Sequence, residues 1–89
     1  MIETNKEGSM ATFILRGHTY SFERKDVENA VKGIEPISIQ KYAVKIHNKE
    51  YPIKQVVRLL TKLDSAEFTA HDAYRVLKKI GFPINSYEN

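Results

Sequence analysis

The sequence predicts a small α+β domain in which about three helices pack on a small antiparallel sheet. Short β-prone runs with alternating apolar residues indicate the strands, and apolar residues that recur at steps of three and four indicate the helices. The length of 89 residues is enough for one domain with one small core. We assign this single domain to residues 11–86. Residues 1–10 have no hydrophobic period, and we expect them to form a mobile N-terminal tail.

A β-hairpin and a helix are predicted for the first third of the chain. The β-prone runs 12–15 and 19–22 flank Gly17, and glycine suits the positive φ that a tight hairpin turn requires. From Glu23 onward the apolar spacing becomes helical, and Gly33 is expected to end this first helix. Its predicted core face consists of Val27, Ala30, Val31 and Ile34.

The middle of the chain combines a strand with a second helix. Residues 41–47 alternate between apolar and polar side chains, which predicts a half-buried strand, and Asn48-Lys49 supplies a turn. Pro52 is expected at the first position of the second helix, where its missing N–H has no cost. The apolar stripe of that helix consists of Ile53, Val56, Val57, Leu60 and Leu63.

A third helix and a last strand complete the predicted fold. Thr69 and Asp72 have the spacing of a capping box, which marks the start of the helix, and Gly81 marks its end. The run 82–84 is then expected to return to the edge of the sheet.

Several classes of function are disfavoured by the residues that the sequence lacks. It contains no cysteine, which excludes disulfides, thiolate metal sites and a cysteine nucleophile, and a reducing cytoplasm is the expected setting. The histidines His18, His47 and His71 lie far apart and outside zinc-binding spacings. No glycine-rich phosphate loop and no apolar run of membrane-spanning length is present. We therefore predict a protein that is not an enzyme and that uses no metal or cofactor.

The positive charge is concentrated in one stretch. The chain has 14 basic and 11 acidic residues, but residues 41–62 alone contain six basic residues and one acidic residue. Such a local excess is typical of a surface that binds a polyanion. If the strand and the second helix are neighbours, six cations face the same side: Lys41, Lys45, Lys49, Lys54, Arg58 and Lys62. A membrane surface is disfavoured as the partner, because the core needs the apolar stripe of the helix.

A known order of motifs runs through residues 24–84. The segment 41–46 leads to Tyr51-Pro52-Ile53-Lys54-Gln55, and the last helix ends in Leu77-Lys78-Lys79-Ile80-Gly81-Phe82. This order resembles the DNA-reading domains of bacterial modification-dependent HNH restriction endonucleases, including the sulfur-binding domain that recognises phosphorothioate DNA. In those domains a helix precedes a strand, a turn, a Tyr-Pro-Pro-Lys-Ala type of corner with its helix, and a final helix that ends in Leu-Gly-Phe.

The resemblance implies a DNA reader without a nuclease. It places Tyr51 and Pro52 at an apolar rim that would meet a modified backbone group, with Lys54 beside them. Gln55 stands where the family has a small alanine, so it would fill or polarise the shallow cavity that accepts sulfur. The family's histidine–arginine pair has no counterpart, and no HNH motif follows. These differences argue against phosphorothioate specificity and leave open plain DNA or DNA with another modification.

Two functional hypotheses follow from these observations. The first is a stand-alone module that binds double-stranded DNA through a basic strand–helix surface, with Tyr51 and His47 sensing the groove or the backbone. The alternative is a small protein-interaction or regulatory adaptor, for example a partner of a separately encoded nuclease. The sequence leaves the choice between DNA and RNA and the oligomeric state open. The candidate nucleic-acid-binding residues are Lys45, His47, Lys49, Tyr51, Pro52, Lys54, Gln55, Arg58 and Lys62.

Overall fold

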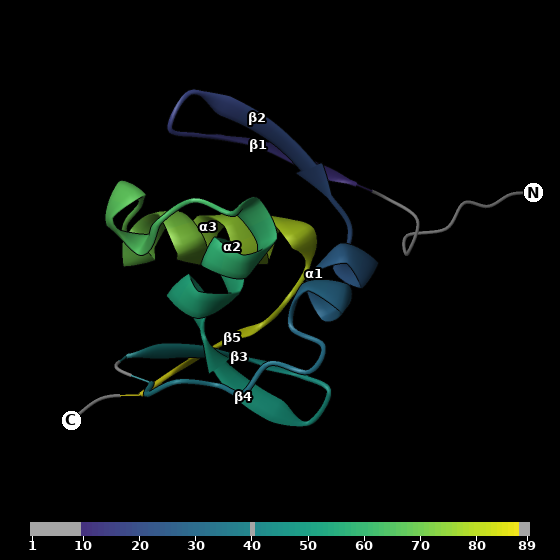
Figure 1. The fold of residues 1–89 in the computed structure, drawn as a ribbon, viewed down its shortest axis with the longest axis vertical. Coiled ribbons are helices and arrows are strands. Elements are labelled where there is room, and N and C mark those ends of the chain that lie inside the picture. Colours follow the sequence, from purple (N-terminus) through teal and green to yellow (C-terminus); the bar gives the residue numbers. More distant parts are fainter. Residues whose placement is uncertain (1–9, 40, 88–89) are drawn as a thin grey trace, which may run out of the picture.

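Three helices lie between two small antiparallel sheets in the computed structural model, which describes residues 10–39 and 41–87 (Figure 1). This confirms the predicted α+β class. The strands, which the sequence alone assigned to one sheet, are divided between two. In chain order the elements are β1 (Ala11–Leu15), β2 (His18–Phe22), α1 (Arg24–Ala30), β3 (Tyr42–Ile46), β4 (Lys49–Pro52), α2 (Ile53–Thr61), the short 3₁₀ helix η2 (Ser65–Glu67), α3 (Ala70–Ile80) and β5 (Ile84–Ser86).

The predicted mobile tail, residues 1–10, lies outside the described residues except for Met10.

Both hairpins turn through two residues with positive φ. Arg16 and Gly17 (φ 52° and 80°) join β1 to β2, and His47 and Asn48 (φ 53° and 66°) join β3 to β4. Turns of this kind match the right-handed twist of the strands that they connect. The first turn lies where it was predicted. The second was predicted at residues 48–49 and lies one residue earlier, which makes His47 a turn residue.

The larger sheet has the strand order β4-β3-β5, with both neighbours antiparallel to the central strand. The predicted return of the chain to this sheet is confirmed, although β5 begins at Ile84, two residues later than expected. The alternation along β3 holds for Val44 and Ile46, which are buried, and for Lys45, which is exposed. Ala43 departs from it, because this small side chain lies between its strand partners Pro52 and Asn85 and is fully buried.

The first helix, α1, is shorter than predicted. It begins with a capping box in which the main-chain N–H of Glu23 donates to the Asp26 carboxylate at 2.8 Å. It ends at Ala30, and Gly33 has a φ of 77° that no helix accommodates. Ile34, assigned to the helix from its spacing, therefore lies in the segment that leads to β3.

The other two helices begin and end close to the predicted residues. Pro52 is the residue before α2 and still belongs to β4, so the helix starts one residue later than expected. It ends at Thr61, and Lys62 follows in a left-handed conformation with φ 69°. The Thr69–Asp72 capping box and the termination of α3 at Gly81 (φ 115°) are both confirmed.

One core fills the space between the two sheets. The buried apolar residues of α2 (Ile53, Val56, Val57 and Leu60) belong to the same cluster as those of α1, β3 and α3. Leu63, the last residue of the predicted stripe, lies beyond the end of α2 and packs against this core while only partly buried. Since the other four residues of the stripe are buried in the core, the charged side of the helix remains at the surface. In the part of the chain described, no helix is long and apolar enough to cross a membrane.

Candidate functional site

A pocket of about 340 Å³ lies where α2 begins, beside the start of β3. The segment before β3 forms one wall, and the connection from η2 to α3 approaches from another side. The pocket therefore joins three stretches of the chain that are separated in sequence, within residues 37–42, 52–58 and 65–70. Its lining residues are Ile37, Ser38, Lys41, Tyr42, Pro52, Ile53, Lys54, Gln55, Arg58, Ser65 and Ala70.

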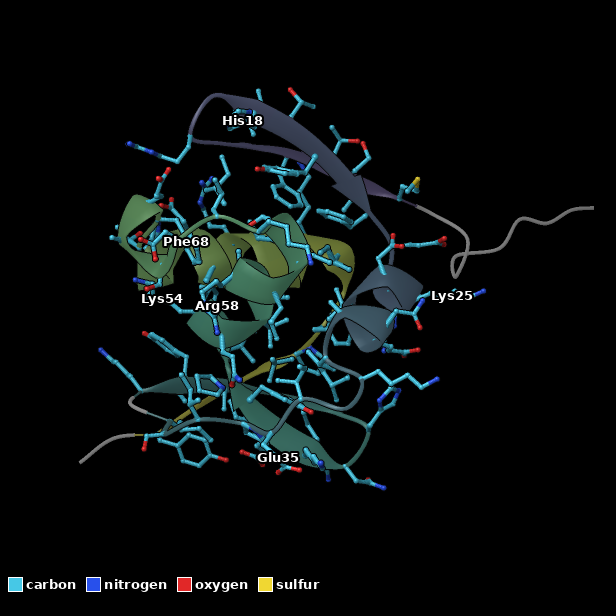
Figure 2. The ribbon with its side chains drawn as sticks, viewed as in Figure 1. His18, Lys25, Glu35, Lys54, Arg58 and Phe68 are labelled. Carbon is cyan, nitrogen blue, oxygen red and sulfur yellow. The ribbon has the colours of Figure 1, made fainter. Side chains whose placement is uncertain are left out.

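The charged residues that line this pocket are all cations. Lys41, Lys54 and Arg58 line it, and no aspartate or glutamate does. None of the three forms a salt bridge with another residue that the structure describes. Figure 2 shows Lys54 and Arg58 on the same side of α2, whereas Lys25 projects from the other side of the molecule. Unpaired like charges around a concave surface attract an anion that neutralises them. We call Lys41, Lys54 and Arg58 the cation cluster.

Helical spacing and two aromatic rings position these cations. Lys54 and Arg58 are four residues apart on α2, so their side chains lie one above the other. The Lys54 ammonium lies 5.3 Å from the centre of the Phe68 ring, and the Lys41 ammonium lies 5.4 Å from the centre of the Tyr42 ring. Cation–π contacts of this length keep each ammonium near the protein without neutralising its charge.

The N-terminus of α2 adds to the positive potential. The residue before the helix, Pro52, has no side-chain oxygen with which to cap it, and the first turn contains no acidic residue. The free N–H groups of a helix start carry partial positive charge and favour an anion. The helix terminus and the cation cluster therefore both favour the binding of an anion in this pocket.

Gln55 fixes the wall of the pocket formed by the segment before β3. Its Nε2 donates to the main-chain oxygen of Glu35 at 3.0 Å, and its Oε1 accepts from the main-chain N–H of Ile37 at 3.0 Å. The side chain is only 4% exposed. Although Gln55 lines the pocket, its amide is already used by the protein, so its main role is to hold the wall in place.

Tyr51 is not at the apolar rim where the family resemblance placed it. The register pairs it with Val44, which puts its side chain on the face of the sheet that the core covers. It is 2% exposed, and its hydroxyl donates to the main-chain oxygen of Ile34 at 2.8 Å. The expectation that Tyr51 senses DNA is corrected accordingly. Pro52 is buried too, but it does line the pocket.

The predicted surface of six cations does not form as one patch. Lys45 projects from the face of β3 opposite Val44, beside its strand partner Glu50. Lys49 lies at the hairpin end of β4, where its ammonium is 3.2 Å from the Glu35 carboxylate.

Two further candidates lie outside the pocket as well. His47 is exposed in the turn beside Lys49, at the end of β4 remote from α2. Lys62 is exposed just past the end of α2, four residues beyond Arg58. Of the candidate nucleic-acid-binding residues, four line the pocket: Pro52, Lys54, Gln55 and Arg58. Lys41, which belongs to the predicted six-cation surface, lines it as well.

Four lining residues carry no signal that sequence reasoning could use. Ile37 and Ser38 come from the segment before β3, and Ser65 and Ala70 come from the starts of η2 and α3. Ala70 lies within the predicted Thr69–Asp72 capping box, which marks a helix start and not a pocket, and the other three belong to no motif or periodic pattern. Tyr42 was assigned to the core from the alternation along its strand, and it is half-buried at the edge of the pocket, with its ring packed edge-on against Tyr74.

The titratable groups with perturbed pKa values lie outside the pocket. The main-chain N–H of Thr69 donates to the Asp72 carboxylate at 3.0 Å and lowers the pKa of that carboxyl. A hydrogen bond to Glu50 raises the pKa of the Tyr87 hydroxyl. The first belongs to a helix cap and the second joins the end of the chain to β4. Within residues 10–39 and 41–87, no group of three or more histidine, aspartate or glutamate side chains is placed to hold a metal ion.

Comparison with known proteins gives one result. No curated protein and no solved structure matches the chain. The SCO5918-like family matches residues 10–89, which is nearly the whole chain and all of its described elements. The chain therefore belongs to the SCO5918-like family.

Proposed function

We propose that this protein is a cytoplasmic DNA-binding module that contacts the phosphate backbone through the cation cluster. The observation that supports this most directly is the pocket itself, in which Lys41, Lys54 and Arg58 meet without an acidic residue. The resemblance of the motif order to that of the restriction-associated DNA readers supports the same partner. Lys62 extends the positive charge along α2 beyond the pocket.

The binding energy in this proposal comes mainly from electrostatics. Each phosphate that a lysine or arginine neutralises releases counterions condensed on the DNA, so the affinity falls as the salt concentration rises. For double-stranded DNA, the logarithm of the binding constant changes with the logarithm of the salt concentration by about −0.9 per phosphate contacted. Three cluster cations and Lys62 therefore predict a slope of about −3 to −4 and an affinity that is modest at physiological salt.

The test is a fluorescence-anisotropy titration of the protein against plain, base-methylated and phosphorothioate duplexes at about 50 and about 200 mM salt. The double variant Lys54→Gln, Arg58→Gln should bind each duplex more weakly, and its salt slope should be smaller by about 2. A matched control is Lys25→Gln, Lys32→Gln, which removes the same charge from exposed positions of α1 and the turn after it. The control should bind nearly as well as the unchanged protein.

Equal losses in the two double variants would show that only net charge matters and would overturn the proposed contacts. Circular dichroism and urea unfolding of both variants confirm that each is folded. If the unchanged protein binds no duplex at the lower salt concentration, DNA binding is rejected. The protein-interaction adaptor is then the function to test, by light scattering and by pull-down of a defined partner.

A further inference from the structure

We propose that the pocket accepts one whole nucleotide unit, with its phosphate at Lys54 and Arg58 and its base against Tyr42 and Ile37. This inference rests on the phosphate contacts proposed above. It adds the sugar and the base, which fill the rest of the pocket. The backbone of a duplex offers only phosphate and sugar to such a site. The nucleotide would therefore come from an unpaired or terminal position of a strand, or from free mononucleotide.

The pocket has a charged part and an apolar part, and a bare phosphate would contact only the charged part. The cation cluster provides the charge, and a second group of lining side chains is apolar: Ile37, Tyr42, Pro52, Ile53 and Ala70. Ile37 is 60% exposed, so its side chain is accessible to a ligand that enters the pocket. An exposed apolar surface next to cations suits a ligand that has an anionic group and a flat apolar group, as a nucleotide does.

The volume supports the same ligand. At about 340 Å³ the pocket lies within the range of small-molecule sites, which begins at about 300 Å³. A phosphate ion has only about five non-hydrogen atoms, so it would fill a fraction of this volume and leave the apolar part of the pocket to water. A nucleoside attached to the phosphate would displace that water from the apolar wall.

Hydroxyl groups complete the lining. Ser38 and Ser65 each offer a donor and an acceptor, which suit the polar edge of a base or a sugar. The amide of Gln55 uses one donor and one acceptor position in its hydrogen bonds to Glu35 and Ile37. These same hydrogen bonds hold Ile37 where a base would meet it. The wall is therefore formed before any ligand arrives.

The first experiment compares three ligands by NMR titration: adenosine monophosphate, inorganic phosphate and adenosine. The monophosphate should bind about tenfold more tightly than either of the others, because only it uses both parts of the pocket. Its shift changes should occur at residues 37–42 and 53–58. If adenosine monophosphate binds no more tightly than inorganic phosphate, the inference is overturned.

Two single variants separate the two halves of the pocket. Ile37→Ala should weaken the binding of adenosine monophosphate by about fivefold and leave the binding of inorganic phosphate unchanged. Arg58→Gln should weaken the binding of both ligands. Ile14→Ala is the matched control, since Ile14 is another exposed isoleucine, 67% exposed on β1, and does not line this pocket. An equal effect of Ile37→Ala on both ligands, or no effect on either, would contradict a base against this wall.

A third experiment distinguishes the source of the nucleotide and separates this inference from the proposed function. Duplexes that carry the fluorescent base 2-aminopurine, either paired or in a single-base overhang, report unstacking as a rise in fluorescence. A rise in fluorescence when the protein binds the overhang duplex indicates that the pocket takes a nucleotide that is part of a strand. Binding of adenosine monophosphate without duplex binding indicates free mononucleotide and rejects the DNA module. Duplex binding without adenosine monophosphate binding leaves the DNA module intact and rejects this inference.

Discussion

The side chain of Gln55 is hydrogen-bonded to the main chain of Glu35 at 3.0 Å, and this contact joins α2 to the segment that precedes β3. A second hydrogen bond, from the Ile37 N–H to the same side chain, completes the connection. The side chain of Gln55 thereby takes up space beside the pocket and holds its wall in place, so the shape of the site depends on this residue.

Replacement of Gln55 tests this connection. Gln55→Met keeps the length of the side chain but leaves the Glu35 oxygen and the Ile37 N–H without their partner, which should lower the free energy of unfolding by about 1–3 kcal/mol. Urea unfolding measures the change. The exposed substitution Lys25→Met serves as control and should change stability by less than about 0.5 kcal/mol. A loss for Gln55→Met no larger than that of the control would contradict the proposed anchoring.

The hydroxyl of Tyr51 provides a second test, because the structure gives it a structural role. Tyr51→Phe removes the hydrogen bond to the Ile34 oxygen without creating a cavity, and should cost about 1 kcal/mol of stability. DNA affinity should stay the same, since the side chain is buried. Chemical denaturation and anisotropy titration of the same sample measure both quantities. Lower DNA affinity with unchanged stability would indicate that the Tyr51 hydroxyl contacts DNA.

Acid should destabilise the protein partly through Asp72. The main-chain N–H of Thr69 holds the pKa of this carboxyl below its ordinary value, so the folded pKa is lower than the unfolded one. Its contribution to stability is therefore complete above the unfolded pKa of about 4 and is lost as the pH falls through the folded pKa.

The variant Asp72→Asn should lack this contribution. It should be less stable than the unchanged protein at neutral pH, and the difference should shrink as the pH falls below about 4. Thermal unfolding from neutral to acid pH measures the trend. A difference that stays constant over this range would show that the charge of Asp72 does not matter to the helix cap.

Arg24 connects the start of α1 to the end of α3. Its guanidinium donates to the main-chain oxygen of Gly81 at 2.6 Å and lies 4.6 Å from the centre of the Phe82 ring. Arg24→Ala should lower the free energy of unfolding by about 1–2 kcal/mol, since both contacts are lost. The adjacent exposed residue Lys25 gives the control, Lys25→Ala, for which urea unfolding should detect little change. Equal effects at the two positions would exclude a specific role for Arg24.

Much of the fold could be predicted from local patterns. The Thr69–Asp72 spacing and Gly81 located α3 almost to the residue, because a cap is a short-range interaction between neighbours in sequence. Gly17 located the first hairpin for the same reason. The end of α1 was harder to predict: Ile34 has helical spacing, but the chain leaves the helix before it and Tyr51 binds its main-chain oxygen.

The candidate site could be predicted only in part. Lys54 and Arg58 were expected on one face because helical geometry alone relates residues four apart. The grouping of Lys45 and Lys49 with them was wrong, since it depended on how β3 and β4 are oriented toward α2. Ile37 and Ser65 could not be found at all, because they reach the pocket from irregular segments.

The sequence by itself determined the α+β class, the concentration of positive charge in residues 41–62 and the basic side of α2. These depend on composition and on periods that a short stretch of chain contains. Only the tertiary structure decided that the strands form two sheets, that Tyr51 is buried and which of the six grouped cations line one pocket. The physical reason is that strand register and the path of irregular segments are fixed by contacts between residues distant in sequence, and a shift of one residue exchanges the buried and exposed faces of a strand.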